Sequence, residues 1–112
     1  MIVLENSTDY GLELTIKDIN NNVVDLSSFD SDNSYCYIVS NDNTVKKDMA
    51  ISIEEPTNGV IKITLTEQTI GSNNINENIL SIDDKKIYRI VLKIKTDSDA
   101  IYSTIDNVVI RG

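Results

Sequence analysis

A tight turn followed by alternating apolar and polar residues is the feature that most constrains this fold. Gly59 supplies a turn conformation that other residues adopt only with strain. In the segment Val60–Thr66, apolar side chains occupy every second position and would share one face of a β-strand: Ile61, Ile63 and Leu65. Because the same pattern returns along the chain, we predict an all-β fold.

The other predicted strands follow the same reasoning. In Ile87–Lys95 two registers compete, and we place the set that begins at Tyr88 toward the core because it is uniformly apolar. The predicted strands are Ile2–Leu4, Tyr10–Lys17, Val23–Leu26, Tyr35–Ser40, Thr44–Ile53, Val60–Thr66, Ile87–Lys95 and Ala100–Ile110. Their predicted core or shared faces are Leu12, Leu14 and Ile16; Met49, Ile51 and Ile53; Tyr88, Ile90, Leu92 and Ile94; and Ile101, Ser103 and Ile105. Turns are predicted at Asp18–Asn22, Asn41–Asn43, Pro56–Gly59 and Asp97–Asp99.

About seven short strands with turns every eight to twelve residues or so are typical of an immunoglobulin-like antiparallel β-sandwich. A small closed barrel is the alternative. The length of 112 residues suits a single domain, residues 1–112, with one core. The Cys–Trp–Cys pattern of antibody domains is absent, because the chain has no tryptophan and one cysteine.

Residues 67–86 lack clear alternation, and structureless loops of this length are uncommon in compact domains. One helical turn over Asn76–Ser81 is compatible with the residues there. Two interpretations stay open: the apolar side chains close the end of the sandwich, or they contact a partner subunit. The candidate interface residues are Ile70, Ile75, Ile79 and Leu80, together with Tyr102, whose strand neighbours Ile101 and Ser103 lie on the opposite face.

We expect neither enzymatic activity nor a cofactor. The chain has no histidine, which excludes Ser–His–Asp and Cys–His arrangements and imidazole ligands for a metal. The adjacent carboxylates of Glu54–Glu55 and Asp83–Asp84 would point to opposite faces of a strand and are interpreted as solvated turns. Acid catalysis of the glycosidase type would need two carboxylates that converge on a cleft.

No metal site is expected either. Residues 30–34 resemble the start of a calcium-binding loop, but an EF-hand needs glycine and glutamate where Tyr35 and Asn41 stand. The single cysteine, Cys36, excludes a disulfide within the chain and a cysteine metal cluster, and we expect it to be buried and inert. A looser calcium site is the alternative, formed by Asp25, Asp30 and Asp32.

The net charge of −8 argues against binding to nucleic acid or to anionic membranes. The charge either matches a basic surface or maintains solubility. Met1–Glu5 lacks the basic start of a signal peptide, and no apolar stretch is long enough to span a membrane. We therefore expect synthesis in a bacterial cytoplasm, with release inside an assembled particle or after lysis as the route out.

Several short segments occur in a recognisable order. Leu12–Asp18 and Asn22–Ser27 combine a strand, a turn and the motif V-D-L-[ST], and Asn58–Thr66 is similar to a G-x-V-x-Y-x-L-T segment. Further strands follow at Tyr35–Val39, Tyr88–Lys95 and Val108–Ile110. In this order the segments resemble the phage baseplate upper protein N-terminal domain family over about residues 8–111.

The resemblance implies an immunoglobulin-like sandwich built into a virion, in the tail baseplate that holds receptor-binding proteins. The implied partners are other virion proteins and further copies of the chain, as a homo-oligomer or on a lattice. Contact would be made by strand addition at a sheet edge or through residues 67–86. A capsid decoration protein of the same fold is one alternative, and a carbohydrate- or cell-surface-binding module is an alternative of another class.

Overall fold

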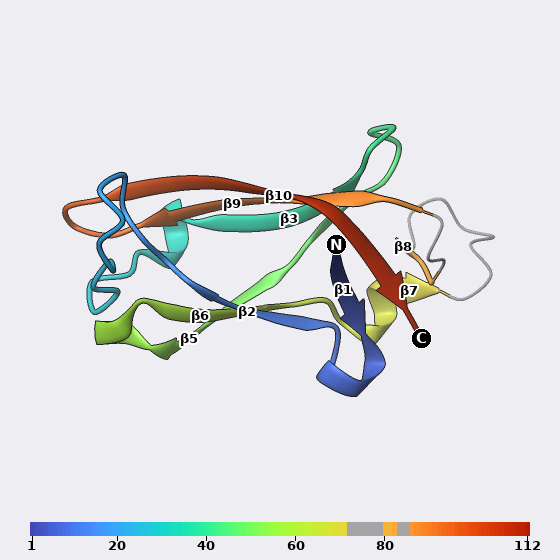
Figure 1. Ribbon diagram of the computed structural model, residues 1–112, viewed down its shortest axis with the longest axis horizontal. Helices are drawn as coiled ribbons and strands as arrows, with labels where there is room; N and C mark the ends of the chain where they lie inside the picture. The colour runs from blue at the N-terminus through green and yellow to red at the C-terminus, as the bar shows by residue number, and fades with distance from the viewer. Residues whose placement is uncertain (72–79, 83–85) are drawn as a thin grey trace.

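The computed structural model of the protein describes residues 1–71, 80–82 and 86–112, and β-strands dominate it (Figure 1). The strands are β1 (Ile2–Glu5), β2 (Gly11–Thr15), β3 (Tyr35–Ser40), β4 (Lys46–Asp48), β5 (Ala50–Glu55), β6 (Val60–Thr64), β7 (Ile70–Gly71), β8 (Leu80–Ser81), β9 (Tyr88–Lys95) and β10 (Ala100–Arg111). Short 3-10 helices lie between them: η1 (Asn6–Thr8), η2 (Ser31–Asn33), η3 (Pro56–Asn58) and η4 (Glu67–Thr69).

Two sheets face each other as the layers of a sandwich (Figure 1). The larger sheet has the strand order β1-β10-β9-β3-β4, and the smaller sheet has the order β2-β6-β5. In the immunoglobulin fold, β2, β6 and β5 would be strands B, E and D, while β3, β9 and β10 would be C, F and G. The predicted all-β sandwich is therefore confirmed, and the two separate sheets argue against the alternative of a closed barrel.

The core lies between the two sheets and follows the predicted faces. On β6, Ile61 and Ile63 have no exposed surface, and on β9 the four residues of the register that begins at Tyr88 are all buried. On β10, Ile101, Ser103 and Ile105 share one face because their partners on β9 are the inward residues Ile94, Leu92 and Ile90. The period-two alternation thus predicted the buried side of each central strand correctly.

The prediction of one strand over Thr44–Ile53 was wrong. Asp48 pairs with Tyr37 in the larger sheet, whereas Ala50 pairs with Thr64 in the smaller sheet. The buried Met49 lies at the change of sheet and donates its backbone N–H to the carbonyl of Cys36 at 2.9 Å. The chain crosses between the layers here, as strands do at the corners of a sandwich.

The prediction of a strand over Val23–Leu26 was also wrong. One isolated antiparallel bridge joins Lys17 to Val23, and Leu26 then donates its N–H to the carbonyl of Pro56. The turn before this segment agrees with the prediction, since Asn21 has a φ of 66°. The backbone groups of this segment thus form hydrogen bonds with several separate parts of the chain and not with one neighbouring strand.

The described residues form more strands than the predicted number of about seven. β1 agrees with the strand predicted at Ile2–Leu4, whereas β4 is a separate strand of the larger sheet and β7 pairs with β8 in a parallel ladder. Leu80 and Ser81 are extended, so the helical turn suggested for Asn76–Ser81 does not include them, and the rest of that range lies outside the described residues.

Candidate functional site

The outward side of the larger sheet brings tyrosines and basic residues together. Pairing places Tyr35 opposite Lys93 and Lys93 opposite Tyr102, which forms one row across β3, β9 and β10. The neighbouring row includes Tyr37, beside Tyr35 on the same face of β3. We call Tyr35, Tyr37, Lys46, Lys93 and Tyr102 the tyrosine face.

The side chains of the tyrosine face contact one another. The rings of Tyr35 and Tyr37 stack with centroids 5.9 Å apart, and Lys46 Nζ lies 4.1 Å from the centroid of the Tyr37 ring. Lys93 Nζ lies 5.7 Å from the centroid of the Tyr102 ring. These cation–π contacts orient the rings at the surface, where each contributes about 0.5–1 kcal/mol.

The tyrosine face differs in charge from the chain as a whole. The protein carries a net charge of −8, yet the outward positions of β9 include Arg89, Lys93 and Lys95. Arg89 belongs to the fold, because it donates to Ser40 O at 3.4 Å and to Asn43 Oδ1 at 2.6 Å. Lys46 and Lys93 instead cover aromatic rings, while the exposed Asp48 lies opposite Tyr37. The aromatic surface around Lys93 is therefore suited to an acidic partner.

Tyr102 was predicted to be exposed, and 66% of its surface is accessible. Tyr35, which the sequence did not single out, is also exposed, whereas Tyr10 and Tyr88 are buried in the core. The alternation of Tyr35 and Tyr37 around the buried Cys36 was the sequence signal for two outward tyrosines. Their proximity to Lys93 depends on strand pairing and had no local signal.

The other candidate residues do not join the tyrosine face. Leu80 is fully buried and Ile70 packs against the core, as does Ile82. For these residues the arrangement agrees with the interpretation that the apolar side chains close one end of the sandwich. Ile75 and Ile79 lie outside the described residues.

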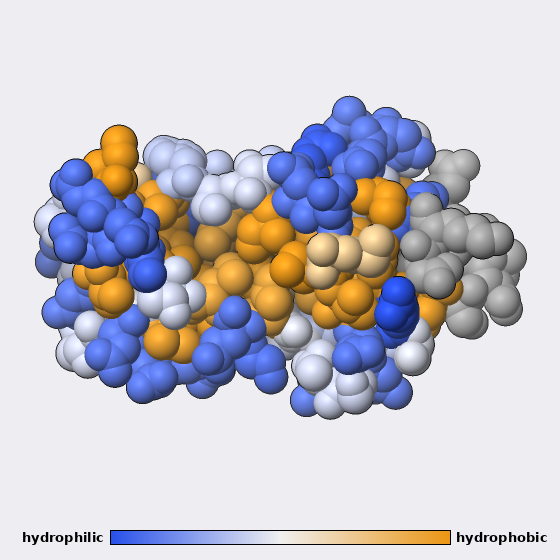
Figure 2. Space-filling model, viewed as in Figure 1, coloured by the Kyte–Doolittle hydropathy of each residue, from blue (hydrophilic) through white to orange (hydrophobic). Residues whose placement is uncertain are grey.

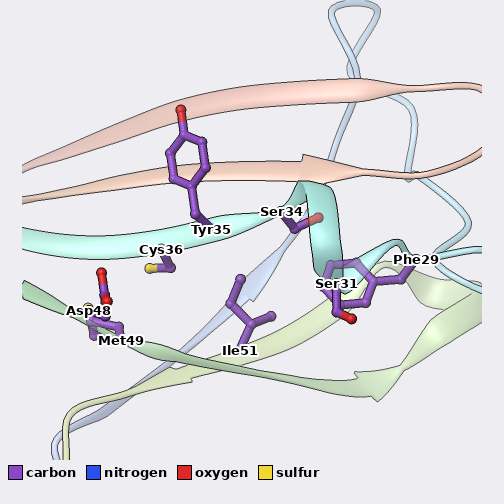
Figure 3. A pocket seen from close by; sticks show the side chains of 8 residues that line it. All are labelled: Phe29, Ser31, Ser34, Tyr35, Cys36, Asp48, Met49 and Ile51. Carbon is purple, nitrogen blue, oxygen red and sulfur yellow. The ribbon is translucent and has the colours of Figure 1, made fainter.

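A hollow of about 350 Å³ opens between β3, β4 and β5 (Figure 3). Cys36, Met49 and Ile51 contribute apolar surface to it, while the ring of Tyr35 points away (Figure 3). Asp48 is the one carboxylate among its described lining residues, so the pair needed for glycosidase-type acid catalysis is not assembled in this part of the structure.

The three aspartates considered for calcium serve local turns. Asp25 Oδ1 accepts hydrogen bonds from Ser27 Oγ at 2.6 Å and from Ser27 N at 2.9 Å, which lower the pKa of the Asp25 carboxyl. The Asn33 side chain donates to Asp30 at 2.7 Å and, with smaller contributions that include the Asp32 N–H, lowers the pKa of Asp30. Among the described residues, no group of three potential ligands converges as a metal site needs.

Comparison of the chain with models of protein families, with curated proteins and with solved structures gives no match. Within residues 1–71, 80–82 and 86–112, no helix is long and apolar enough to cross a membrane.

Proposed function

We propose that this protein is a non-enzymatic structural module of a phage tail or phage-tail-like particle, associated with the baseplate. In this proposal the tyrosine face binds an acidic surface of another particle protein. The observation that carries it is the basic aromatic patch of Tyr35, Lys93 and Tyr102 on an otherwise acidic sandwich. Tyrosine contributes large contact area with few rotatable bonds and is enriched at the energetic centres of interfaces.

The sequence resemblance to the baseplate family supports the location in a particle. The protein would be synthesised in the host cytoplasm and incorporated during assembly. Many copies at symmetric positions would allow a small interface such as the tyrosine face to act repeatedly, so that a modest affinity per site suffices. Capsid decoration by the same sandwich is the alternative location.

Immunogold electron microscopy of particles from the source culture tests this proposal, with antibody raised against the purified protein and the same antibody pre-absorbed on that protein as control. Label at the tail end supports the baseplate location. Label over the head would indicate that the protein lies on the capsid surface. Intact particles without label anywhere would contradict the proposal.

A carbohydrate-binding module is the second candidate, because Tyr35 and Tyr102 are exposed on one face as a sugar-binding surface requires. A glycan array separates the two candidates. Binding of a monomeric protein to a defined glycan, lost on replacement of Tyr102 by alanine, would favour the second candidate. Incorporation into particles without glycan binding would favour the first.

A further inference from the structure

Among the described strands, two edges on one side of the sandwich have no partner. β1 pairs with β10 from Val108 to Arg111, and no described strand pairs with the outer edge of β10 from Ala100 to Ile105. In the smaller sheet, β6 is the one described partner of β2. Unpaired edges present backbone donors and acceptors to which another chain can add a strand.

The pairing of β9 with β10 shows which backbone groups are free. Thr96 donates its N–H to the carbonyl of Asp99 at 2.9 Å, so Asp99 is a hydrogen-bonded position of the ladder between β9 and β10. Such positions occur at every second residue of an antiparallel strand, so the backbone groups of Ile101, Ser103 and Ile105 also point toward β9. The N–H and carbonyl groups of Tyr102 and Thr104 consequently point to the open edge. Two residues of this edge can thus form a regular antiparallel ladder with a new strand.

The open part of β10 lacks the usual protection of an edge. Its six residues, Ala100–Ile105, contain no charge, proline or glycine, although 25% of the chain is charged. Natural edge strands are normally protected by lysine, proline or an inward charge. The edge of β2 is different, since Glu13 stands at its centre and would oppose an identical strand.

An apolar seam lies beneath this edge, between β2 and β10. It is a hollow of about 250 Å³ whose apolar lining is formed by Leu14, Ile16, Leu92, Ile101 and Ile105, and whose polar lining is formed by Thr15, Lys17 and Ser103. Figure 2 shows apolar surface along the band between the two layers of the sandwich. Ile101 and Ile105 are half-buried, and Ser103 between them is exposed. A strand added to β10 would complete their burial.

We infer that the occupant of this edge is a second copy of the chain, joined by antiparallel pairing of β10 with β10 about a two-fold axis beside Ser103. In this register Ile101 of one copy lies opposite Ile105 of the other, and Tyr102 lies opposite Thr104. The outward backbone groups then meet as hydrogen-bonded pairs, and the two larger sheets become one continuous sheet.

A second copy fits this edge for two reasons. The edge carries no charge, and the antiparallel register places the inward side chains of one copy opposite inward side chains of the other, as with Ile101 and Ile105. Two acidic proteins can approach there without placing like charges opposite each other, and the two apolar seams merge into one core. Six residues span only about 20 Å, so the interface is small and the solution dimer should be weak. This inference does not rest on the particle proposal.

Sedimentation over a wide range of protein concentration tests the inference. We expect a monomer–dimer equilibrium, with Ser103→Lys weakening dimerisation about tenfold or more because two ammonium groups would face each other across the axis. Ser52→Lys is the matched control, since Ser52 is an exposed serine on β5, an edge strand of the other sheet. Both variants should stay folded. Ser103→Lys should keep the wild-type melting temperature, whereas Ser52→Lys should lower it slightly because residue 52 lies opposite Lys62.

A mixture of Ser103→Lys with Ser103→Asp should restore the dimer, because opposite charges then meet at the axis. A wild-type protein that stays monomeric at every concentration overturns the inference. A dimer that is insensitive to Ser103→Lys, or a mixture that stays monomeric, overturns it equally.

Cysteine cross-linking detects the same pairing when it is weak. Residues at the axis form a non-hydrogen-bonded pair with Cα atoms about 4.5 Å apart, within the range of about 4.4–6.8 Å that a disulfide spans. Ser103→Cys should therefore form an intermolecular disulfide at least about tenfold faster than Ser52→Cys. The natural Cys36 is buried and does not compete. Equal rates at the two positions would contradict the pairing.

Discussion

Lys93 holds its ammonium group 5.7 Å from the ring centroid of Tyr102, and the two residues are direct partners in the pairing of β9 with β10. The contact orients the ring of Tyr102, a residue that is 66% exposed. Because an exposed contact of this kind contributes little to folding, its removal should affect recognition far more than stability.

Replacement of both exposed tyrosines, Tyr35→Ala with Tyr102→Ala, should abolish incorporation into particles while the melting temperature changes little. The reason is that the two rings provide contact area to a partner and little to the core. Complementation of a particle lacking the protein, followed by immunoblotting of purified particles, measures the effect. Ile19→Ala is the control, because Ile19 is 99% exposed on the Asp18–Asn22 turn and is not one of the residues of the tyrosine face. Normal incorporation of the tyrosine double variant would remove the face from the assembly interface.

Leu80→Ala should lower the free energy of unfolding by about 2–5 kcal/mol, since Leu80 has no exposed surface and its truncation leaves a cavity. Urea denaturation measures the loss. The exposed Val23 provides the comparison, and Val23→Ala should change stability by about 0.5 kcal/mol or less. A Leu80 variant as stable as wild type would place this side chain outside the core and return it to the candidate interface.

Gly59→Ala should destabilise the fold by about 2 kcal/mol or more. Gly59 has a φ of 68°, and an added Cβ would lie 2.9 Å from the carbonyl oxygens of Ile16 and Val24. Thermal and urea unfolding measure the change. Asn21→Gly tests the effect of the backbone conformation alone, because Asn21 has a φ of 66° on an exposed turn. The free energy of unfolding of this variant should stay within about 1 kcal/mol of the wild-type value.

Asp42 makes the stability of the β3–β4 turn depend on pH. Ser40 Oγ donates to Asp42 Oδ1 at 2.6 Å, and Thr44 donates to the same oxygen from Oγ1 at 2.6 Å and from its backbone N–H. These bonds, with that of Ser40 the strongest, hold the pKa of Asp42 well below its ordinary value of 3.8. A depressed pKa in the folded state means that ionised Asp42 stabilises the fold.

Asp42→Ala should therefore unfold at a lower temperature than wild type at neutral pH. The difference should be complete at pH values above 3.8 and should shrink as the pH falls toward the folded-state pKa. Melting curves across acidic pH measure it, and Glu54→Ala, at an exposed position of β5, controls for the loss of one carboxylate. A difference that grows on acidification would have the wrong sign for this explanation.

Cys36 should resist thiol reagents in the folded protein. Burial raises the pKa of its thiol to about 12, so the reactive thiolate is scarce at neutral pH, and only 3% of the residue is exposed. Labelling with a chromogenic disulfide reagent should follow global unfolding and accelerate in denaturant. Rapid labelling under native conditions would show that the hollow beside Cys36 opens to the reagent.

The buried faces of the central strands could be predicted because alternation is a local property. Ile61 and Ile63 lie on one side of β6 whatever it pairs with, and the same holds for the register of β9. The turn at Gly59 was equally predictable, because steric restrictions on φ act within a few residues. These features required no knowledge of the rest of the chain.

Sheet membership could not be predicted in this way. Asp48 and Ala50 are two residues apart, but Asp48 pairs with Tyr37 and Ala50 pairs with Thr64. Both partners lie in other parts of the sequence. The same reason explains the tyrosine face, in which Tyr35, Lys93 and Tyr102 meet through two separate pairings. Val23–Leu26 has the composition of a strand, yet Val23 bridges to Lys17, Val24 donates its N–H to Ile16 O and Leu26 donates its N–H to Pro56 O.

By itself, the sequence determined an all-β chain, the inward side of its central strands and the positions of its main turns. These follow from side-chain sterics and the two-residue period of an extended backbone. The tertiary structure alone decided which strands share a sheet, which tyrosines gather around Lys93 and which edge of β10 stays open. Hydrogen bonding between strands joins residues that are distant in sequence, and no local pattern specifies its partner.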